Sequence, residues 1–434
     1  MRELTAPRAR WAYAARLLDG HRWAVRPTLT SIAASGTAAA TTLVIARGIG
    51  AAAFGHFTVV LTIALIVSVG MLTSLNYVMY QELPRAQPGN RPALVTTALF
   101  STLVLAAGVI AVGLLASPLL TALLGIDVRT LCYSLALALA ITVNQLTDSV
   151  LRGLKRFAFV ANLKFAVAVG YLVASSVALL LLDIRDAEFY LVALILMYVV
   201  FAVVALAGFQ VNPRSWSAAR ARSLYRHGAY VTVIAALVAV LFGIDVILLN
   251  RTAGQADVGA YSVYNGFPKR LLVVLLTEGI GVVLLPTLAT MDKPSLLRRI
   301  RRIAPVVGLA MAVISLAASA VCFLLLRGQY PYSLELMALS AVGIGAHTVF
   351  HLYLFALSMD GVRGAKVFIA CLIVGLPAAL AGQALSIAWW GLVGALVAFA
   401  LTNLLLVAIL AFAAARLYRP QDSAAMTPVP EVAP

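Results

Sequence analysis

The sequence predicts an all-α polytopic membrane protein with about 12 transmembrane helices. Of its 434 residues, 63% are hydrophobic and only 11% are charged, and the mean hydropathy is +1.00. Soluble globular proteins carry roughly 25% charged residues, so this composition excludes a soluble enzyme and a nucleic-acid-binding domain. The apolar residues fall in runs of about 20, the length at which a helix crosses a hydrocarbon core of ~30 Å.

The apolar runs form two groups of six. The first group predicts spans at 28–46, 57–80, 94–117, 130–150, 160–182 and 188–209. The second group predicts spans at 229–250, 258–290, 303–326, 334–357, 365–385 and 389–412. An even number of spans places both termini on the same side of the membrane.

The two groups divide the chain into five segments. We expect an N-terminal segment at 1–27, an N-terminal half at 28–210, a basic connector at 211–228, a C-terminal half at 229–412 and a disordered tail at 413–434. The connector is interpreted as an ordinary linker, with a surface helix on anionic lipid as the alternative. The Arg-rich N-terminal segment has no apolar run followed by a cleavage site, so we expect no removable signal peptide.

The basic residues predict the orientation. The net charge is +16, and 25 of the 32 Lys and Arg residues lie in the termini and in the connections on one side. The opposite connections hold five, and the remaining two lie inside a span. Cytoplasmic loops carry the excess of Lys and Arg. We therefore expect both termini to be cytoplasmic and the basic loops to face anionic lipids rather than nucleic acid.

Ionisable residues inside the spans are candidate functional groups, because a charge in hydrocarbon costs several kcal/mol unless it meets a partner or a cavity. The candidates are seven: Asp148, Asp245, Lys269, Arg270, Glu278, His347 and His351. The three cysteines also lie in apolar runs, and they are too few for a disulfide framework or a zinc site. We expect no metal centre.

Lys269 and Arg270 are the deepest of these groups. The eighth span enters from outside, which places them about 15–18 Å along the helix at 1.5 Å per residue, and Pro268 just before them can kink it. Neighbouring side chains diverge by about 100°, so both can face one water-filled vestibule. Two buried cations suit a diphosphate. The alternative is a salt bridge between the two halves of the chain, to Asp245 or Glu278.

The other ionisable groups have local interpretations. Asp148 and Arg152 are four residues apart on one helix face, which favours an ion pair. Asp245, near the outer end of the seventh span, either pairs at the interface or lines a cavity. His347 and His351 also share a face; without a third ligand we favour hydrogen-bonded packing over metal binding, with proton sensing or ligand contact as the alternative.

Hydroxyl groups are concentrated on the first span. They predict either contacts that hold helices together or one wall of a wet cavity, with the second span contributing further polar groups. The residues concerned are Thr28, Ser31, Ser35 and Thr42 on the first span, and Asn76 and Tyr77 on the second.

Four segments match a known family in order and spacing. They are ARGIGAAAFGHF (46–57), LRGLKRFAFVANL (151–163), FGIDVILLNRTAGQADVGAYSVYNGFPKRLL (242–272) and GVVLLPTLA (281–289). The first is similar to the pattern Arg-x-Leu-Gly-x-x-x-Phe-Gly-x-Tyr/Phe. Over the whole membrane region, the sequence resembles bacterial polysaccharide flippases of the multidrug/oligosaccharidyl-lipid/polysaccharide exporter superfamily.

The resemblance implies two pseudo-symmetric six-helix lobes around a central cavity, in the bacterial cytoplasmic membrane. It implies alternating access and a polyprenyl-diphosphate-linked oligosaccharide as substrate. Lys269 and Arg270 match the family's cavity cations, and Arg47 matches the arginine of the junction motif. Gln81 stands where a basic residue is common in the family. The substrate-binding candidates are therefore Lys269, Arg270, Arg47, Asn76, Tyr77, Ser31 and Ser35.

Transport of this kind needs no cofactor, but it can be coupled to a proton or sodium gradient. The ion-coupling candidates are Asp245, Glu278, His347 and His351. Partners beyond the lipid-linked oligosaccharide and anionic lipids would be proteins of glycan assembly.

Three other functions compete with this interpretation. A drug exporter of the same superfamily would favour aromatic and acidic cavity residues, whereas this chain has two central cations. A major-facilitator transporter would carry a Gly-x-x-x-Asp-Arg-x-Gly-Arg-Arg type loop, and 81–93 has no such motif. A membrane glycosyltransferase, polymerase or ligase would need acidic residues for acid–base or metal work, and the outer connections hold only scattered aspartates.

Overall fold

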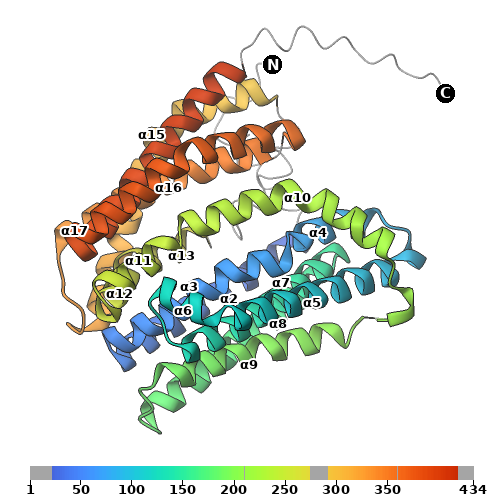
Figure 1. The fold of residues 1–434 in the computed structure, drawn as a ribbon, viewed down its shortest axis with the longest axis horizontal. Helices are drawn as coiled ribbons and strands as arrows, with labels where there is room; N and C mark the ends of the chain where they lie inside the picture. The colour runs from blue at the N-terminus through green and yellow to red at the C-terminus, as the bar shows by residue number, and fades with distance from the viewer. Residues whose placement is uncertain (1–21, 210, 274–291, 359, 419–434) are drawn as a thin grey trace.

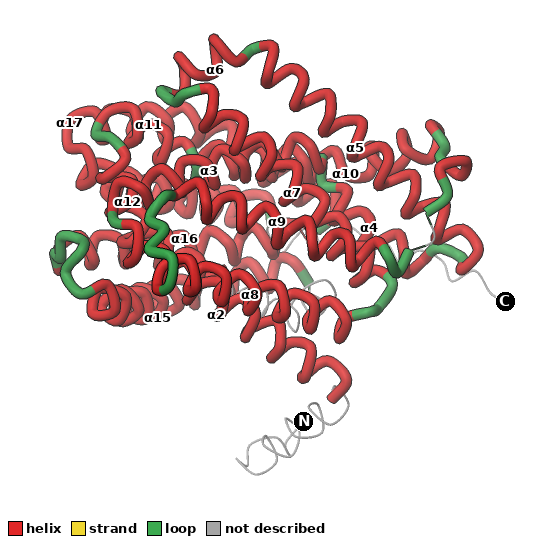
Figure 2. Tube along the Cα trace, turned by 90° about the horizontal axis from the view of Figure 1, so that it is seen from below, coloured by secondary structure: helices red, strands yellow, loops and turns green. Residues whose placement is uncertain are grey.

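The fold is described by a computed structural model, which covers residues 22–209, 211–273, 292–358 and 360–418. Every regular element in these ranges is helical, which confirms the predicted all-α class. Ten of the described helices are long and apolar enough to cross a membrane. Figure 2 shows the helical trace with short connecting loops, and Figure 1 gives the helix labels used below.

The first half of the chain forms the N-lobe, which we define as helices α2 to α9. Its six long helices correspond to the first six predicted spans: α2 (Arg22–Ile49), α3 (Ala51–Leu72), α5 (Arg91–Leu115), α7 (Val128–Gly153), α8 (Phe157–Leu180) and α9 (Ala187–Leu206). Shorter elements are α4 (Leu75–Arg85), η1 (Pro88–Asn90) and α6 (Ser117–Leu124), and η2 (Pro213–Ser215) follows the lobe.

The second half forms the C-lobe, which we define as helices α10 to α17. It begins with α10 (Ala218–Leu241), α11 (Ile244–Thr252), α12 (Gln255–Tyr261), η3 (Ser262–Gly266) and α13 (Phe267–Val273). It continues with α15 (Lys293–Leu326), α16 (Leu334–Ser358) and α17 (Gly361–Leu417).

Helix α17 doubles back on itself and supplies the last two predicted spans. Gly391 has φ 52° and ψ −124°, a conformation that glycine adopts without steric cost, and it breaks the helical run. Gly375, before the break, lies close to Leu406 and Ile409, after the break. The two parts of α17 therefore run antiparallel. Part of the predicted span 258–290 lies outside the described residues, and the count of 12 spans therefore stays a prediction.

Three predicted boundaries differ from the structure. The second span is broken where Thr73 and Ser74 adopt left-handed conformations between α3 and α4. The seventh is broken at Gly243, between α10 and α11. Helix α10 begins at Ala218, so most of the predicted connector 211–228 is helical; Ser217 caps this helix by accepting a hydrogen bond from the backbone N–H of Arg220.

Helix α10 is the first helix of the C-lobe and lies between the other helices of that lobe and the N-lobe (Figure 1). Its first half packs on the N-lobe, where Leu224 joins a buried cluster with residues of α4 and α5. Its second half packs on the C-lobe through Ile234 and Leu241. The ribbons of the lobes are close together near α11 and α12 and diverge towards the ends where α10 and α15 begin.

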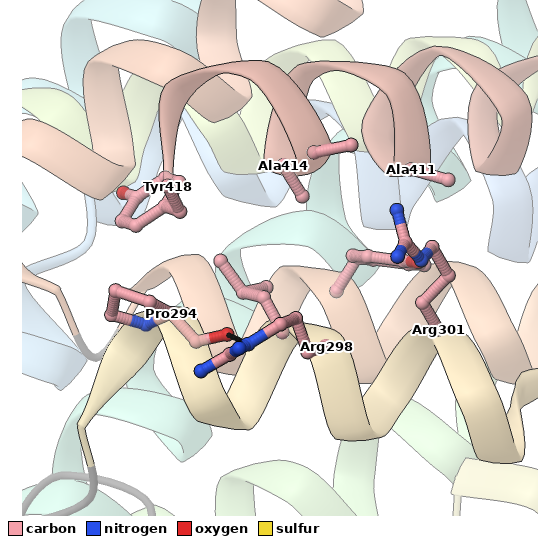
Figure 3. A pocket seen from close by; sticks show the side chains of 9 residues that line it. Pro294, Arg298, Arg301, Ala411, Ala414 and Tyr418 are labelled. Atoms are coloured by element: carbon pink, nitrogen blue, oxygen red, sulfur yellow. Dashed lines mark hydrogen bonds between the residues drawn. The ribbon is translucent and has the colours of Figure 1, made fainter. Parts of the chain in front are cut away.

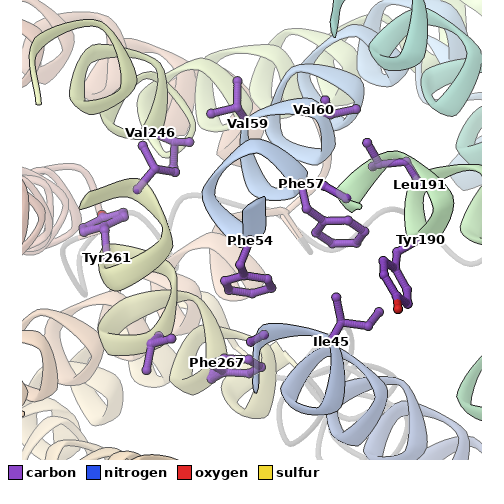
Figure 4. Close-up of a cluster of buried hydrophobic side chains, with 14 of the residues drawn as sticks. Ile45, Phe54, Phe57, Val59, Val60, Tyr190, Leu191, Val246, Tyr261 and Phe267 are labelled. Atoms are coloured by element: carbon purple, nitrogen blue, oxygen red, sulfur yellow. The ribbon is translucent and has the colours of Figure 1, made fainter. Parts of the chain in front are cut away.

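The lobes meet in an aromatic cluster at the end where they are close (Figure 4). Phe54 of α3 stacks on Phe57 of the same helix at 6.1 Å and on Phe267 of α13 at 6.0 Å between ring centroids. Tyr330, which follows α15, donates a hydrogen bond to the Ala46 carbonyl of α2 at 2.9 Å. The Phe54–Phe267 pair crosses the interface, and an aromatic pair contributes about 0.5–1.5 kcal/mol beyond area burial.

The closest approach between the lobes depends on two glycines. A Cβ atom on Gly55 of α3 would lie 1.7 Å from the carbonyl oxygen of Gln255, and one on Gly259 of α12 would lie 2.0 Å from that of Ala51. Neither backbone can move without separating the helices. Small residues of this kind let membrane helices pack closely, because lipid provides no hydrophobic drive for helices to associate.

We expect Gly259→Ala to lower the thermal unfolding midpoint in detergent, because overpacking costs about 1–3 kcal/mol. Gly70→Ala is the control: Gly70 lies in α3, the partner helix, and no atom lies within 4 Å of an added Cβ there, so the midpoint of this variant should not fall. Equal midpoints for the two variants would contradict a tight interface between α3 and α12.

Candidate functional site

The candidate site is a cavity between the lobes, with a volume of about 190 Å³. On the N-lobe side it is lined by α3, including Thr58 and Thr62. On the C-lobe side it is lined by α10 to α13, including Asn265, Lys269 and Arg270. Both predicted cations therefore face one hollow, as the sequence predicts.

A π-helical turn positions the two cations. Residues 262–266 form this turn, and single π turns inside helices are frequent at functional sites. Pro268 has no N–H, so the Tyr264 carbonyl four residues earlier lacks its usual helical donor. Ser340 of α16 replaces it by donating a hydrogen bond to this carbonyl at 2.7 Å. The break in the helix is thus satisfied within the protein, as hydrocarbon surroundings require.

Lys269 is surrounded by two aromatic rings and one carboxylate. Its Nζ atom lies 4.0 Å from the centroid of the Phe399 ring and 6.0 Å from that of Phe242. The same atom lies 4.0 Å from Oδ2 of Asp245, whose side chain is 2% exposed. Cation–π contacts strengthen when they are desolvated. The predicted Lys269–Asp245 pair is present, but both partners belong to the C-lobe.

Asp245 is held by a second set of contacts. It accepts a hydrogen bond from the hydroxyl of Tyr261 and one from the backbone N–H of Val246 at 2.8 Å. Asn265, which lines the cavity, donates through its side-chain amide to the Tyr261 hydroxyl at 2.5 Å. A continuous polar chain therefore runs from the cavity wall to the carboxylate that pairs with Lys269.

Arg270 connects the two lobes. Its Nη1 atom donates to Oγ1 of Thr42 on α2 at 2.7 Å. The Thr42 hydroxyl itself donates to the Ala38 carbonyl at 2.9 Å, which leaves its lone pairs to accept from the guanidinium. Among the described residues, no carboxylate lies within ion-pair distance of Arg270. One residue of the predicted hydroxyl stripe is thus a direct partner of a cavity cation.

The two histidines pack in an aromatic cluster beside Lys269. His347 is 6% exposed, and its Nδ1 lies 2.8 Å from Oδ1 of Asn403. Its ring is edge-on to that of Phe242 at 4.6 Å, and His351 lies 4.4 Å away ring to ring. The predicted hydrogen-bonded packing is confirmed. In the described part of the chain, no three His, Cys, Asp or Glu residues are grouped so that they could hold a metal ion.

A second cavity of about 250 Å³ lies within the N-lobe, among α2, α7, α8 and α9. Ser35 lines it, as does Lys164, whose Nζ lies 3.2 Å from Oδ1 of Asp148. Arg152 Nε contacts Oδ2 of the same carboxylate at 3.1 Å. The predicted Asp148–Arg152 pair is confirmed, and Lys164 of α8 extends it to a triad.

The remaining predicted residues do not line the cavity between the lobes. Arg47 is exposed in the last turn of α2. Asn76 and Tyr77 are half-buried on the short helix α4, beyond the break at Thr73 and Ser74. Ser31 is buried on α2. Glu278 lies outside the described residues.

The chain matches a family model described as polysaccharide biosynthesis protein over residues 27–292, more than half of its length. No curated protein matches it. The similarity to solved structures extends over nearly the whole chain.

Three solved transporters share the fold. An inward-facing multidrug resistance MATE family transporter of the MOP superfamily has a TM-score of 0.67 at 13% identity, covering 90% of this chain and 96% of that one. A MOP superfamily transporter from Pyrococcus furiosus has 0.61 at 13%, covering 91% and 95%. The lipid II flippase MurJ, inward closed, has 0.60 at 12%, covering 88% and 87%. At these identities the similarity establishes the fold alone.

We expect a double-mutant cycle of Asp245→Asn and Lys269→Met to give a coupling free energy of about 0.5–3 kcal/mol, as contacting buried partners do. The measurement is the unfolding midpoint of each single variant and of the double variant. The control is Asp183→Asn with Arg185→Met: that pair lies 2.9 Å apart, but both side chains are at least 70% exposed, so its coupling should be about 0–1 kcal/mol. Equal coupling in the two cycles would show that Lys269 and Asp245 are not a buried pair.

Proposed function

The chain belongs to the family of polysaccharide biosynthesis proteins, and we propose that it is a flippase for a polyprenyl-diphosphate-linked oligosaccharide. It would move this lipid from the cytoplasmic to the outer leaflet of the bacterial cytoplasmic membrane. The observation that supports the proposal is the pair of cations, Lys269 and Arg270, in the cavity between the lobes.

The chemistry of the two cations suits a diphosphate. The guanidinium of Arg270 can give a phosphate two parallel hydrogen bonds, while the ammonium of Lys269 acts as a point charge. Asp245 offsets one positive charge, so the described groups of the cavity keep a net charge of +1. This favours an anionic ligand and disfavours the cationic substrate of a drug exporter.

The size of the cavity fits a headgroup but not a glycan. Binding pockets for drug-sized ligands are about 300–1,000 Å³, and this cavity is about 190 Å³. The sugar would therefore cross only when the lobes rock apart, which is the alternating access of transporters built from two repeats. The prenyl chain would remain in lipid. In the arrangement of Figure 1, the lobes diverge towards the Arg-rich ends of α10 and α15, which the basic residues assign to the cytoplasm.

Energy coupling would act through groups that contact the cations. Asp245 is the candidate that pairs with Lys269, so its occupation by a proton or a sodium ion would alter the charge offered to the diphosphate. The His347 ring contacts the two aromatic rings that flank Lys269, and the His351 ring contacts that of His347. Proteins that assemble or extend the glycan would be partners on either side of the transport step.

We expect Lys269→Ala and Arg270→Ala each to slow transfer of a polyprenyl-diphosphate-linked oligosaccharide in proteoliposomes by about tenfold. The reason is that a hydrogen bond to a charged group contributes about 1.5–3 kcal/mol and 1.4 kcal/mol corresponds to tenfold. Lys269→Arg and Arg270→Lys retain the charge and should retain more of the rate. Each variant's unfolding midpoint shows whether it is folded.

The control variant is Arg85→Ala, which removes a surface cation of α4 whose side chain is 74% exposed. It should transport at the rate of the unmodified protein. Unchanged transport by a folded Lys269→Ala, Arg270→Ala double variant would refute the proposed role of the cations. Saturable transport of a cationic dye by the unmodified protein would favour a drug exporter instead.

A further inference from the structure

A second basic pocket lies away from the transport cavity, between α15, α16 and α17 (Figure 3). Its volume is about 170 Å³. Arg298 and Arg301 line it from α15, and Tyr353 lines it from α16. Figure 3 shows Arg301 extending from α15 towards α17, beside Ala411. The pocket is at the end of the C-lobe where α15 begins and α17 ends.

The two arginines offer several free donors. They are three residues apart on one helix, so they share a face. Arg298 uses its Nε to donate to the Pro294 carbonyl at 3.3 Å, which leaves its terminal nitrogens available. Within the described ranges, neither arginine has a carboxylate within ion-pair distance. An anion entering the pocket would meet two guanidinium groups, which bind phosphate oxygens in a bidentate manner.

The carboxylates at this end of the lobe are engaged elsewhere. Asp292 caps α15 and accepts hydrogen bonds from Ser295, which lower the pKa of Asp292, and the charge of Arg298 lowers it further. Asp360 accepts a hydrogen bond from the Tyr418 hydroxyl at 2.6 Å. Arg363 stands 5.0 Å over the Tyr418 ring. Neither carboxylate lines the pocket, so its lining is positive.

Tyr353 provides the second observation that points to a ligand. The residue is 1% exposed, and it lines the pocket from α16, opposite Arg298 and Arg301 of α15. A phenol hydroxyl donates one hydrogen bond. A phosphate oxygen or its bound water in the pocket can accept it.

The apolar side of the pocket favours a lipid over a soluble anion. Ala411, Ala414 and Ala415 of α17 leave room opposite the arginines. Beyond them, Val306 and Leu309 on α15 are 70% and 68% exposed, as residues that face acyl chains are. A molecule with a phosphate at one end and a hydrocarbon chain at the other matches both parts of this surface.

We propose that this pocket is a binding site for the headgroup of an anionic phospholipid, with Arg298 and Arg301 on the phosphate, Tyr353 as a further donor, and one acyl chain along α15. Basic pockets between membrane helices on the cytoplasmic side bind anionic headgroups in this way. The site does not depend on what the protein transports. It ties the ends of three C-lobe helices together, so the bound lipid stabilises the C-lobe.

The test compares lipids on the full-length protein in detergent. Adding phosphatidylglycerol should raise the unfolding midpoint, and native mass spectrometry should show retained lipid, whereas phosphatidylcholine at the same concentration should do neither. In the double variant Arg298→Gln, Arg301→Gln, the apparent affinity for phosphatidylglycerol should fall by about tenfold. Tyr353→Phe, which keeps the ring, should give a smaller loss.

The matched control is Arg299→Gln, Arg302→Gln. It removes the same charge from the same helix, but these two residues do not line the pocket. It should bind phosphatidylglycerol like the unmodified protein. An equal loss of affinity in both double variants would show that the lipid responds to surface charge rather than to the pocket, and would overturn the proposal. Inorganic phosphate that stabilises the protein as strongly as the lipid would show a site for soluble anions, and would also overturn it.

Discussion

The contacts between several helices depend on one constraint: a positive charge in a low-dielectric interior must be stabilised by protein groups. Lys269 and Arg270 lie in a cavity between two lobes, where water cannot fully solvate them, so protein groups must do so. Lys269 is solvated by Asp245 from α11 and by the Phe399 ring from α17. Arg270 is solvated by the Thr42 hydroxyl of α2. Because each partner comes from another helix, the charges also fix how these helices meet.

The contact of Arg270 bears on how the two lobes can move apart. Its hydrogen bond to Thr42 joins the C-lobe to the N-lobe, close to the stacked rings of Phe54 and Phe267. A diphosphate that engaged Arg270 would compete with Thr42 for the same guanidinium. In the proposed cycle, substrate binding would therefore remove one of the hydrogen bonds between the lobes. The other contacts at that end include the hydrogen bond from Tyr330 to the Ala46 carbonyl and close packing through Gly55 and Gly259, and the two lobes would rock about these contacts.

Positive charge serves different purposes in different parts of the molecule. The cavity cations are few, half-buried and partly compensated. The arginines of α15 are exposed and close to the ends of the helices, where lipid headgroups lie. Arg152 and Lys164 share the Asp148 carboxylate inside the N-lobe, which compensates part of their charge. The partners of each cation, rather than charge alone, distinguish the proposed transport site from the proposed lipid site and from the triad.

The sequence by itself determined the features that depend on local spacing and composition. Runs of apolar residues set the helices, and i, i+4 spacing set the Asp148–Arg152 pair and the shared face of His347 and His351. Only the tertiary structure decided the rest. Thr42 and Arg270 are 228 residues apart, Ser340 and Tyr264 are 76 apart, and no periodicity carries such pairings. Arg47 matched a family motif but is exposed, and nothing in the local sequence around Thr73 and Ser74 signals their left-handed turn. Helix formation follows from neighbours along the chain, whereas the partner of a buried polar group is set by how whole helices pack.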